Sequence, residues 1–288
     1  MTIKIVTDSS CDLGIDFVKK NNIEFVPLLL NLDGENIEDD LGKSLGYREF
    51  YDKLREGSMP STSQINIYTF EEKFRELLNE GYEILYLGLS SALSGTFNSA
   101  NMARNNILEE NPNAKISVVD SLSVSMGVGM LVKKSCDMIE EGKDLEYITT
   151  WIEENKNKVI HSILVDDLKH LKRGGRISAS TAAVGSLLNI KPILKIDNNG
   201  AVEATEKIKG KKKALKYLAT VVKEKAVNIE SETLYIMHGD ALEEAQVLKD
   251  IILQELNFKE IKIQYIGTVI GSHGGPGTIA TIFWGNER

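Results

Sequence analysis

The first half of the chain alternates between short apolar segments and amphipathic segments, and this alternation restricts the fold more than any other feature. Each β-branched segment typical of a buried strand is followed by a segment with helical periodicity. The strand candidates are Ile3–Thr7, Ile23–Leu30, Ile84–Leu87 and Ile116–Val119, and the helix candidates are Gly14–Asn22, Tyr47–Glu56, Tyr68–Asn79, Thr96–Glu110 and Ser125–Glu141. Strands separated by helices of this length indicate βαβ units and a mostly parallel sheet.

The second half has a different pattern. The segment Asp197-Asn198-Asn199-Gly200 lies between Pro192–Ile196 and Ala201–Ile208, which is typical of a hairpin turn between antiparallel strands. The other candidates are helices at Leu145–Asn155, Ser178–Asn189, Lys211–Val227 and Ala241–Leu256, and strands at Val159–Val165, Thr233–Met237, Ile261–Tyr265 and Thr278–Phe283. We therefore predict an α/β protein of two domains. Residues 1–160 form a mostly parallel sheet flanked by helices, and residues 161–288 form a mixed-sheet α/β domain.

Composition narrows the function classes. The 288 residues carry a formal net charge of −8, and the basic run Lys207–Lys216 is interpreted as the solvated face of a helix. Nucleic-acid binding depends on Lys and Arg that neutralise phosphates, so the acidic balance argues against it. No apolar run approaches the length of a membrane span, and the N-terminus lacks the apolar core of a signal peptide. We therefore expect a cytoplasmic protein with no integral membrane segment.

The two cysteines, Cys11 and Cys136, lie far apart and show no zinc-binding or CxxC spacing. Both are predicted to be free thiols in a reducing compartment. Cys11 follows Asp8-Ser9-Ser10, so a reactive thiol is the alternative to a small buried packing residue.

Three segments rich in hydroxyl groups and glycine suggest where a ligand binds. They are Pro60-Ser61-Thr62-Ser63-Gln64, Ser90-Ser91-Ala92-Leu93-Ser94-Gly95-Thr96 and Gly271-Ser272-His273-Gly274-Gly275-Pro276-Gly277. Each offers neutral or nearly neutral hydrogen-bond donors on backbone that Gly or Pro keeps irregular. Two of the segments follow apolar runs, where loops of α/β proteins gather ligands. We predict that they converge on a pocket for a small acidic molecule.

Each segment also has a purely structural interpretation. Ser94 precedes a helix candidate and either binds an anion or caps the helix, and Ser61–Ser63 either bind or form a turn that caps a helix. Four glycines around His273 favour close approach of the backbone to a ligand, with His273 donating a hydrogen bond. Asp8-Ser9-Ser10 either joins the pocket or caps the next helix.

The sequence lacks the motifs expected of two classes of enzyme. A serine hydrolase would use Ser94 or Ser9 with His273, but the chain has no G-x-S-x-G elbow and no Asp placed by sequence as the orienting partner. A phosphoryl-transfer enzyme would need metal-binding carboxylates or a P-loop. The adjacent pairs Asp39-Asp40 and Asp166-Asp167 come without a P-loop. We therefore predict no metal and no cofactor.

Taken in order, the motifs resemble those of the DegV family over nearly the whole chain. They are Val6–Leu13, Pro60–Gln64, Ser90–Thr96, Val119-Asp120-Ser121, Leu171–Ile177 and Gly271–Gly277. The resemblance implies a two-domain α/β protein that binds one long-chain fatty acid, such as palmitate, between its domains. It also implies a non-catalytic binding subunit of a bacterial fatty acid kinase, which presents the carboxyl group to a separate ATP-using catalytic subunit.

The resemblance also implies roles for particular residues. Thr62 and Ser94 would hydrogen-bond the fatty-acid carboxylate, and His273 would join the same network. By composition, Arg173–Arg176 is an exposed basic turn, which is interpreted as either a solvated loop or a docking site. The resemblance implies that the kinase is the partner that would dock there. The last motif has Ser272 where the family often has Thr, but it keeps the His and the Gly-Pro-Gly end. The remaining alternatives are a serine-dependent lipid or acyl-phosphate hydrolase using Ser94 and His273, and a regulatory interaction module.

Overall fold

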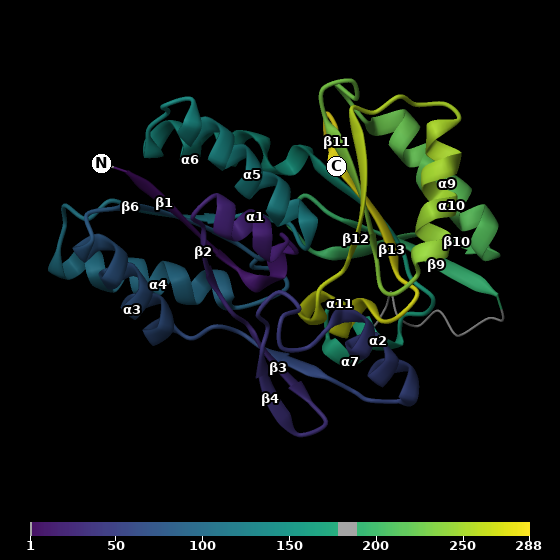
Figure 1. Ribbon diagram of the computed structural model, residues 1–288, viewed down its shortest axis with the longest axis horizontal. Coiled ribbons are helices and arrows are strands. Elements are labelled where there is room, and N and C mark those ends of the chain that lie inside the picture. Colours follow the sequence, from purple (N-terminus) through teal and green to yellow (C-terminus); the bar gives the residue numbers. More distant parts are fainter. Residues whose placement is uncertain (1, 178–188) are drawn as a thin grey trace.

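The computed structural model describes residues 2–177 and 189–288, which form three sheets with helices packed between and around them (Figure 1). The predicted helix at Ser178–Asn189 falls on residues 178–188, which lie outside the described part. The predicted fold class is confirmed, since one sheet is parallel, a second is mixed and helices cover both. The predicted boundary near residue 160 stays a prediction.

Sheet A is a parallel sheet built from the first half of the chain, with strand order β2-β1-β6-β7. Side chains alternate between its two faces, so Ile84 and Tyr86 pack against α3 and α4, while Leu85 and Leu87 pack against α5. The strands are β1 (Ile3–Asp8), β2 (Glu24–Val26), β6 (Glu83–Gly88) and β7 (Ile116–Asp120). The helices of this half are η1 (Ser9–Cys11), α1 (Ile15–Lys20), α2 (Tyr47–Glu56), α3 (Ile67–Asn79), α4 (Thr96–Glu110), α5 (Met126–Glu140), α6 (Leu145–Asn155) and η2 (Lys156–Lys158).

Sheet C is the mixed sheet, with strand order β10-β9-β8-β13-β11-β12. Its β11–β12 pair is parallel, and its other pairs are antiparallel. The predicted hairpin is confirmed, since β9 and β10 pair across the Asp197–Gly200 turn, where Gly200 has a φ of 81°. The strands are β8 (Val159–Leu164), β9 (Ile190–Ile196), β10 (Val202–Lys209), β11 (Thr233–His238), β12 (Glu260–Tyr265) and β13 (Ile279–Trp284). The helices are α7 (Lys169–Gly174), α9 (Lys211–Lys225), α10 (Leu242–Leu253) and α11 (Thr268–Gly274).

Helix α5 joins the two sheets into one packed body. Its apolar face lies in a core that takes Leu85 and Leu87 from sheet A and Met237, Ala280 and Ile282 from sheet C. The opposite face of sheet C is covered by α9 and α10, which lie side by side (Figure 1). Helices α9 and α10 therefore cover the outer face of sheet C, while α5 and a cavity share its inner face.

The segment Ile23–Leu30, predicted as one strand, is divided in the structure. Pro27 has no N–H to donate to a ladder, so β2 ends at Val26 and the chain turns into β3 (Leu29–Leu32). β3 belongs to a separate antiparallel sheet, sheet B, with order β4-β3-β5. Its other strands are β4 (Glu35–Glu38) and β5 (Ser61–Ser63), which the sequence did not predict.

In the described part of the chain both cysteines are free and buried, which confirms the packing interpretation. Burial raises the pKa of the Cys11 thiol far above its ordinary value, so its nucleophilic thiolate form is suppressed. None of the helices in residues 2–177 and 189–288 has the length and apolar character needed to cross a membrane.

Candidate functional site

An apolar cavity lies between the inner face of sheet C and the first half of the chain. It encloses about 920 Å³ of space, its mouth included. Alternate residues of three neighbouring strands form its floor: Val165, Ile163 and His161 from β8 and its C-terminal extension, Leu194 and Ile196 from β9, and Ala280 and Ile282 from β13. Thr62, Ser94, Arg176 and His273 contribute polar groups. The cavity is thus lined mostly by apolar side chains along the sheet, and its polar side chains gather where α7, α11 and β5 meet.

The strand register gives the direction of the cavity. Ala280 pairs with Ile163, and Ile282 pairs with His161. Thr278, which also lines the cavity, hydrogen-bonds Gly274 of α11 at 2.8 Å and so lies at the polar end. From Thr278 to Ile282 a strand advances about 13 Å. The cavity is therefore an elongated tunnel that runs along the strands, with Ile282 and His161 at its far end.

The first predicted residue, Thr62, lies at the centre of β5. Its Oγ1 is 2.9 Å from Nε2 of His273, although the two residues are 211 positions apart. The prediction of an irregular turn here is wrong, because Ser61–Ser63 pair with β3 and place Thr62 opposite Leu30. The alternative that Ser61–Ser63 cap a helix is also wrong, since Asn66 caps α3 by accepting a hydrogen bond from Thr69 N.

His273 lies in the last turn of α11, so the prediction that all of Gly271–Gly277 is irregular is wrong. The irregular part begins at Gly275, which has a φ of 79°, as does Gly277. An L side chain rarely adopts this conformation, and the space beside Gly275 is occupied by the His170 ring. These two glycines therefore serve a tight turn that holds the end of α11 against α7.

Burial, and to a smaller extent the charges of Arg176, Arg173 and His170, lower the pKa of His273 to about 4. The imidazole is therefore neutral near pH 7, with one nitrogen as donor and the other as acceptor. Within the described side chains, Nδ1 of His273 is buried and has no hydrogen-bond partner. A neutral imidazole donates a hydrogen bond to an anion without carrying a buried charge of its own.

Ser94 lies in the turn before α4, directly before Gly95, the N-cap residue of that helix. Its Oγ accepts a hydrogen bond from Thr96 N at 3.2 Å, and it also lines the tunnel. A second bond joins it to Thr96 Oγ1 at 2.9 Å. Over the residues that the structure describes, no hydrogen bond joins Ser94 to His273, and no carboxylate orients His273. The arrangement that a serine hydrolase requires is not assembled there.

The sequence places Arg176 in a basic turn interpreted as either a solvated loop or a docking site, and in the structure it lines the tunnel. The basic segment is mostly helix, since α7 spans Lys169–Gly174 and ends at Gly175 with a φ of 70°. Arg176 follows that end, and its Nε donates to Leu93 O at 3.0 Å, beside Ser94. Guanidinium groups match carboxylates in charge and shape. That chemistry was visible in the sequence, but its direction toward the tunnel was not.

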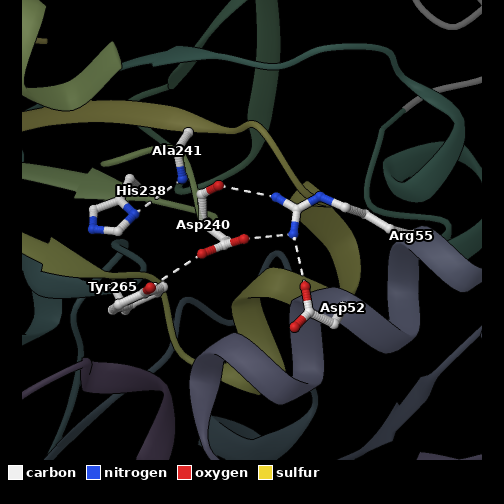
Figure 2. Close-up of polar contacts among 6 residues, drawn as sticks. All are labelled: Asp52, Arg55, His238, Asp240, Ala241 and Tyr265. Carbon is white, nitrogen blue, oxygen red and sulfur yellow. Dashed lines mark hydrogen bonds and ion pairs between the residues drawn. The ribbon is translucent and has the colours of Figure 1, made fainter. Parts of the chain in front are cut away.

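A cluster of polar contacts around Arg55 and Asp240, called here the Arg55–Asp240 cluster, supports the polar end of the tunnel. Figure 2 shows its contacts. Arg55 of α2 forms an ion pair with the Asp240 carboxylate and donates to Asp240 O at 2.9 Å, while Tyr265 donates to the same carboxylate at 3.1 Å. The preceding residue, Gly239, donates to Thr278 O at 2.8 Å and accepts from Gly277 N at 2.7 Å. The Arg55–Asp240 cluster therefore fixes the turn at Gly239 and Asp240, and the Gly275–Gly277 segment is held against that turn.

Three buried carboxyl groups lie beside the tunnel. Asp8 caps η1 by accepting from Ser10 N at 3.1 Å, so capping is the observed role of the Asp8-Ser9-Ser10 segment. Asp12 bonds to Ser125, which lines the tunnel, and accepts from Gly267 N at 3.0 Å. It thus links the end of β1 to the starts of α5 and α11. Burial, with the charge of Asp39 acting in the same direction, raises the pKa of Asp12 to about 8.

The raised pKa of Asp12 predicts a stability that falls with rising pH. Between pH 4 and 8 the folded chain holds a proton that the unfolded chain has released, so its free energy of unfolding decreases as pH rises. Asp12→Asn removes this contribution and keeps the shape. Relative to wild type, the variant is expected to gain about 2 kcal/mol between pH 6 and pH 8. Urea unfolding at both pH values measures the change, and a constant difference between the two proteins contradicts the prediction.

Across residues 2–177 and 189–288, no group of three or more His, Cys, Asp and Glu side chains is placed to hold a metal ion.

Comparisons with known proteins agree with this architecture. A family model described as "Uncharacterised protein, DegV family" matches residues 2–285. A DegV domain-containing protein of Clostridium perfringens is 45% identical over 284 residues, covering 99% of this chain and 98% of the relative. A solved structure of a Thermus thermophilus DegV family protein, described by its fatty acid binding, has a TM-score of 0.89 at 33% identity, covering 99% of this chain and all of the other. A DegV family protein of Eubacterium eligens, loaded with heptadecanoic acid, has a TM-score of 0.84 at 27% identity, with 99% and 100% coverage. The chain described here belongs to the DegV family.

Proposed function

We propose that this protein binds one long-chain fatty acid, such as palmitate, with the carboxylate at Thr62, Ser94, His273 and Arg176. The acyl chain then lies along the inner face of sheet C. The observation that carries the proposal is the shape and chemistry of the tunnel, which is lined mostly by apolar residues along three strands and has Thr62, Ser94, Arg176 and His273 together at one end. The relatives described as binding fatty acids, heptadecanoic acid among them, support it.

The polar end suits a carboxylate. A buried carboxylate is unfavourable unless donors replace its water, and two hydroxyls and a neutral imidazole supply such donors. Arg176 adds a compensating charge beside them.

The apolar part supplies the affinity. At about 0.8 kcal/mol per buried methylene, some fourteen methylenes contribute roughly 11 kcal/mol before the cost of association. A tunnel of this kind holds its ligand tightly without a catalytic group. We therefore infer a carrier and not an enzyme acting on its own.

We further propose that the carrier presents its ligand to a fatty acid kinase catalytic subunit. Helix α7 supports this step, because its exposed Lys172 and Arg173 lie next to the polar end of the tunnel. Packing there is so close that a Cβ on Gly174 would meet the His273 ring. An acidic or ATP-bearing partner that contacts α7 would thus reach the carboxyl group. The test is formation of acyl phosphate on the carrier when ATP and a fatty acid kinase catalytic subunit are added.

The experiment that tests binding is direct. The protein is purified under native conditions, extracted with organic solvent and examined by mass spectrometry. We expect a long-chain fatty acid in the extract at a ratio near one per chain. Absence of any such acid, together with no binding of added oleate or palmitate, contradicts the proposal. Serine-dependent turnover of p-nitrophenyl esters or acyl phosphates would favour the hydrolase instead.

A further inference from the structure

A second cavity lies behind the far end of the tunnel. About 620 Å³ of space, part of it open to solvent, lies between sheet C and α9, and Lys195, Thr205, Tyr217 and Lys225 line it on the outer side. Three residues, His161, Leu194 and Ile196, line both this cavity and the tunnel. These three residues therefore form a wall that the two spaces share.

The wall is made of side chains because strands β8 and β9 separate at this point. Their ladder pairs Ile163 with Leu194 and Leu164 with Ile193, and it does not continue to His161 and Ile196. The opening is spanned at its edge by the Arg288 guanidinium, which donates to Val159 O at 3.0 Å and to Asp197 O at 2.9 Å. His161 lies on β8 beside this opening, between that bridge and the end of the ladder, and it lines both the tunnel and the second cavity.

The His161 ring is held in a fixed position. Its Nε2 lies 3.1 Å from Ser123 Oγ and 3.3 Å from Val124 O, and the residue is only 2% exposed. A Cβ on Gly127 would clash with both Ser123 Oγ and the ring, so the start of α5 is pressed against it. Burial, and then the charge of Arg288, lowers the pKa of His161 to about 3, so the ring is neutral and compatible with an apolar tunnel.

We infer that His161 is the end-stop of the acyl tunnel and sets the maximum length of chain that the protein binds. The inference rests on the proposed function. Ile282, the strand neighbour of His161, marks the last position of the tunnel floor, and beyond the ring lies space that the ligand does not reach. Loss of the ring joins the two cavities and lets longer chains extend past Leu194 and Ile196.

The test compares acyl-length profiles. Wild type and His161→Ala are stripped of lipid, exchanged with an equimolar mixture of saturated acids from myristate to behenate, and analysed by mass spectrometry of the bound fraction. Each methylene that gains an apolar place is worth about a fourfold change in affinity. For each protein, the affinity for an acid two carbons longer than the wild-type optimum is divided by the affinity for that optimum. We expect this ratio to be about fifteenfold higher in His161→Ala than in wild type.

Further variants separate the wall from other effects. His161→Val, which suits a strand, is the second opening variant if the alanine variant does not fold, and it is expected to shift the profile in the same direction. Tyr217→Ala enlarges the second cavity from its outer side without removing the wall, and it should also leave the profile unchanged.

Two outcomes overturn the inference. One is a wild-type profile in both opening variants, and the other is an equal shift in Tyr217→Ala. Both leave the proposed function in place, because the wild-type protein still carries its fatty acid. Failure of the wild-type protein to bind any acid contradicts the proposed function itself, so the two failures are distinguishable.

Discussion

The double substitution Thr62→Ala with Ser94→Ala is expected to weaken binding of palmitate at least ~100-fold. A hydrogen bond to a charged group contributes about 1.5–3 kcal/mol, and two such donors to the carboxylate are lost together. Removing Thr62 also releases His273, since their 2.9 Å bond positions the imidazole at the tunnel. Competition against a fluorescent fatty acid measures the loss, and thermal unfolding in the absence of lipid verifies the fold.

Ser61→Ala is the matched control for this pair. Ser61 lies on the same short strand as Thr62 but is exposed, and it does not line the tunnel. Its substitution should leave palmitate binding within about twofold of wild type. Equal binding by the double variant and by wild type would remove Thr62 and Ser94 from the carboxylate site.

The fold was largely predictable, because alternating strand and helix patterns depend on local periodicity. The exceptions depend on tertiary contacts. A three-residue strand such as Ser61–Ser63 has no pattern of its own and exists because β3 is adjacent to it. Likewise, Thr268–Gly274 contains glycines that disfavour a helix. It is helical because it packs between α2 and α7, where a Cβ on Gly271 would meet the Tyr51 ring.

The candidate site was predictable only in its polar part. Hydroxyl and imidazole groups on separate segments point to an anion, and the structure brings Thr62, Ser94 and His273 to one tunnel. Arg176 was visible as a cation, but its place depends on where α7 ends. The tunnel lining was not predictable at all, because residues such as Ala280 and Ile163 have the same composition and alternation as ordinary core residues. Only the packing distinguishes a filled core from a space left for a ligand.

The substitution Ala280→Phe is expected to give the largest loss of palmitate binding. Ala280 lies midway along the tunnel floor, between Thr278 at the polar end and Ile282 at the far end, and it is 5% exposed. A phenyl ring there excludes roughly half of the acyl chain. About seven methylenes at ~0.8 kcal/mol each correspond to a ~10,000-fold loss of affinity.

The length of the ligand provides the control for Ala280→Phe. Octanoate reaches only the polar end of the tunnel, where Thr62, Ser94 and His273 are unchanged, so its affinity should be the same for the variant and for wild type. Palmitate should then bind the variant no more tightly than octanoate does. Overpacking typically costs about 1–3 kcal/mol of stability, and a lipid-free unfolding curve accounts for that cost. Because the ring blocks the tunnel without touching a donor, full palmitate binding by a folded Ala280→Phe protein would mean that the acyl chain does not lie along sheet C.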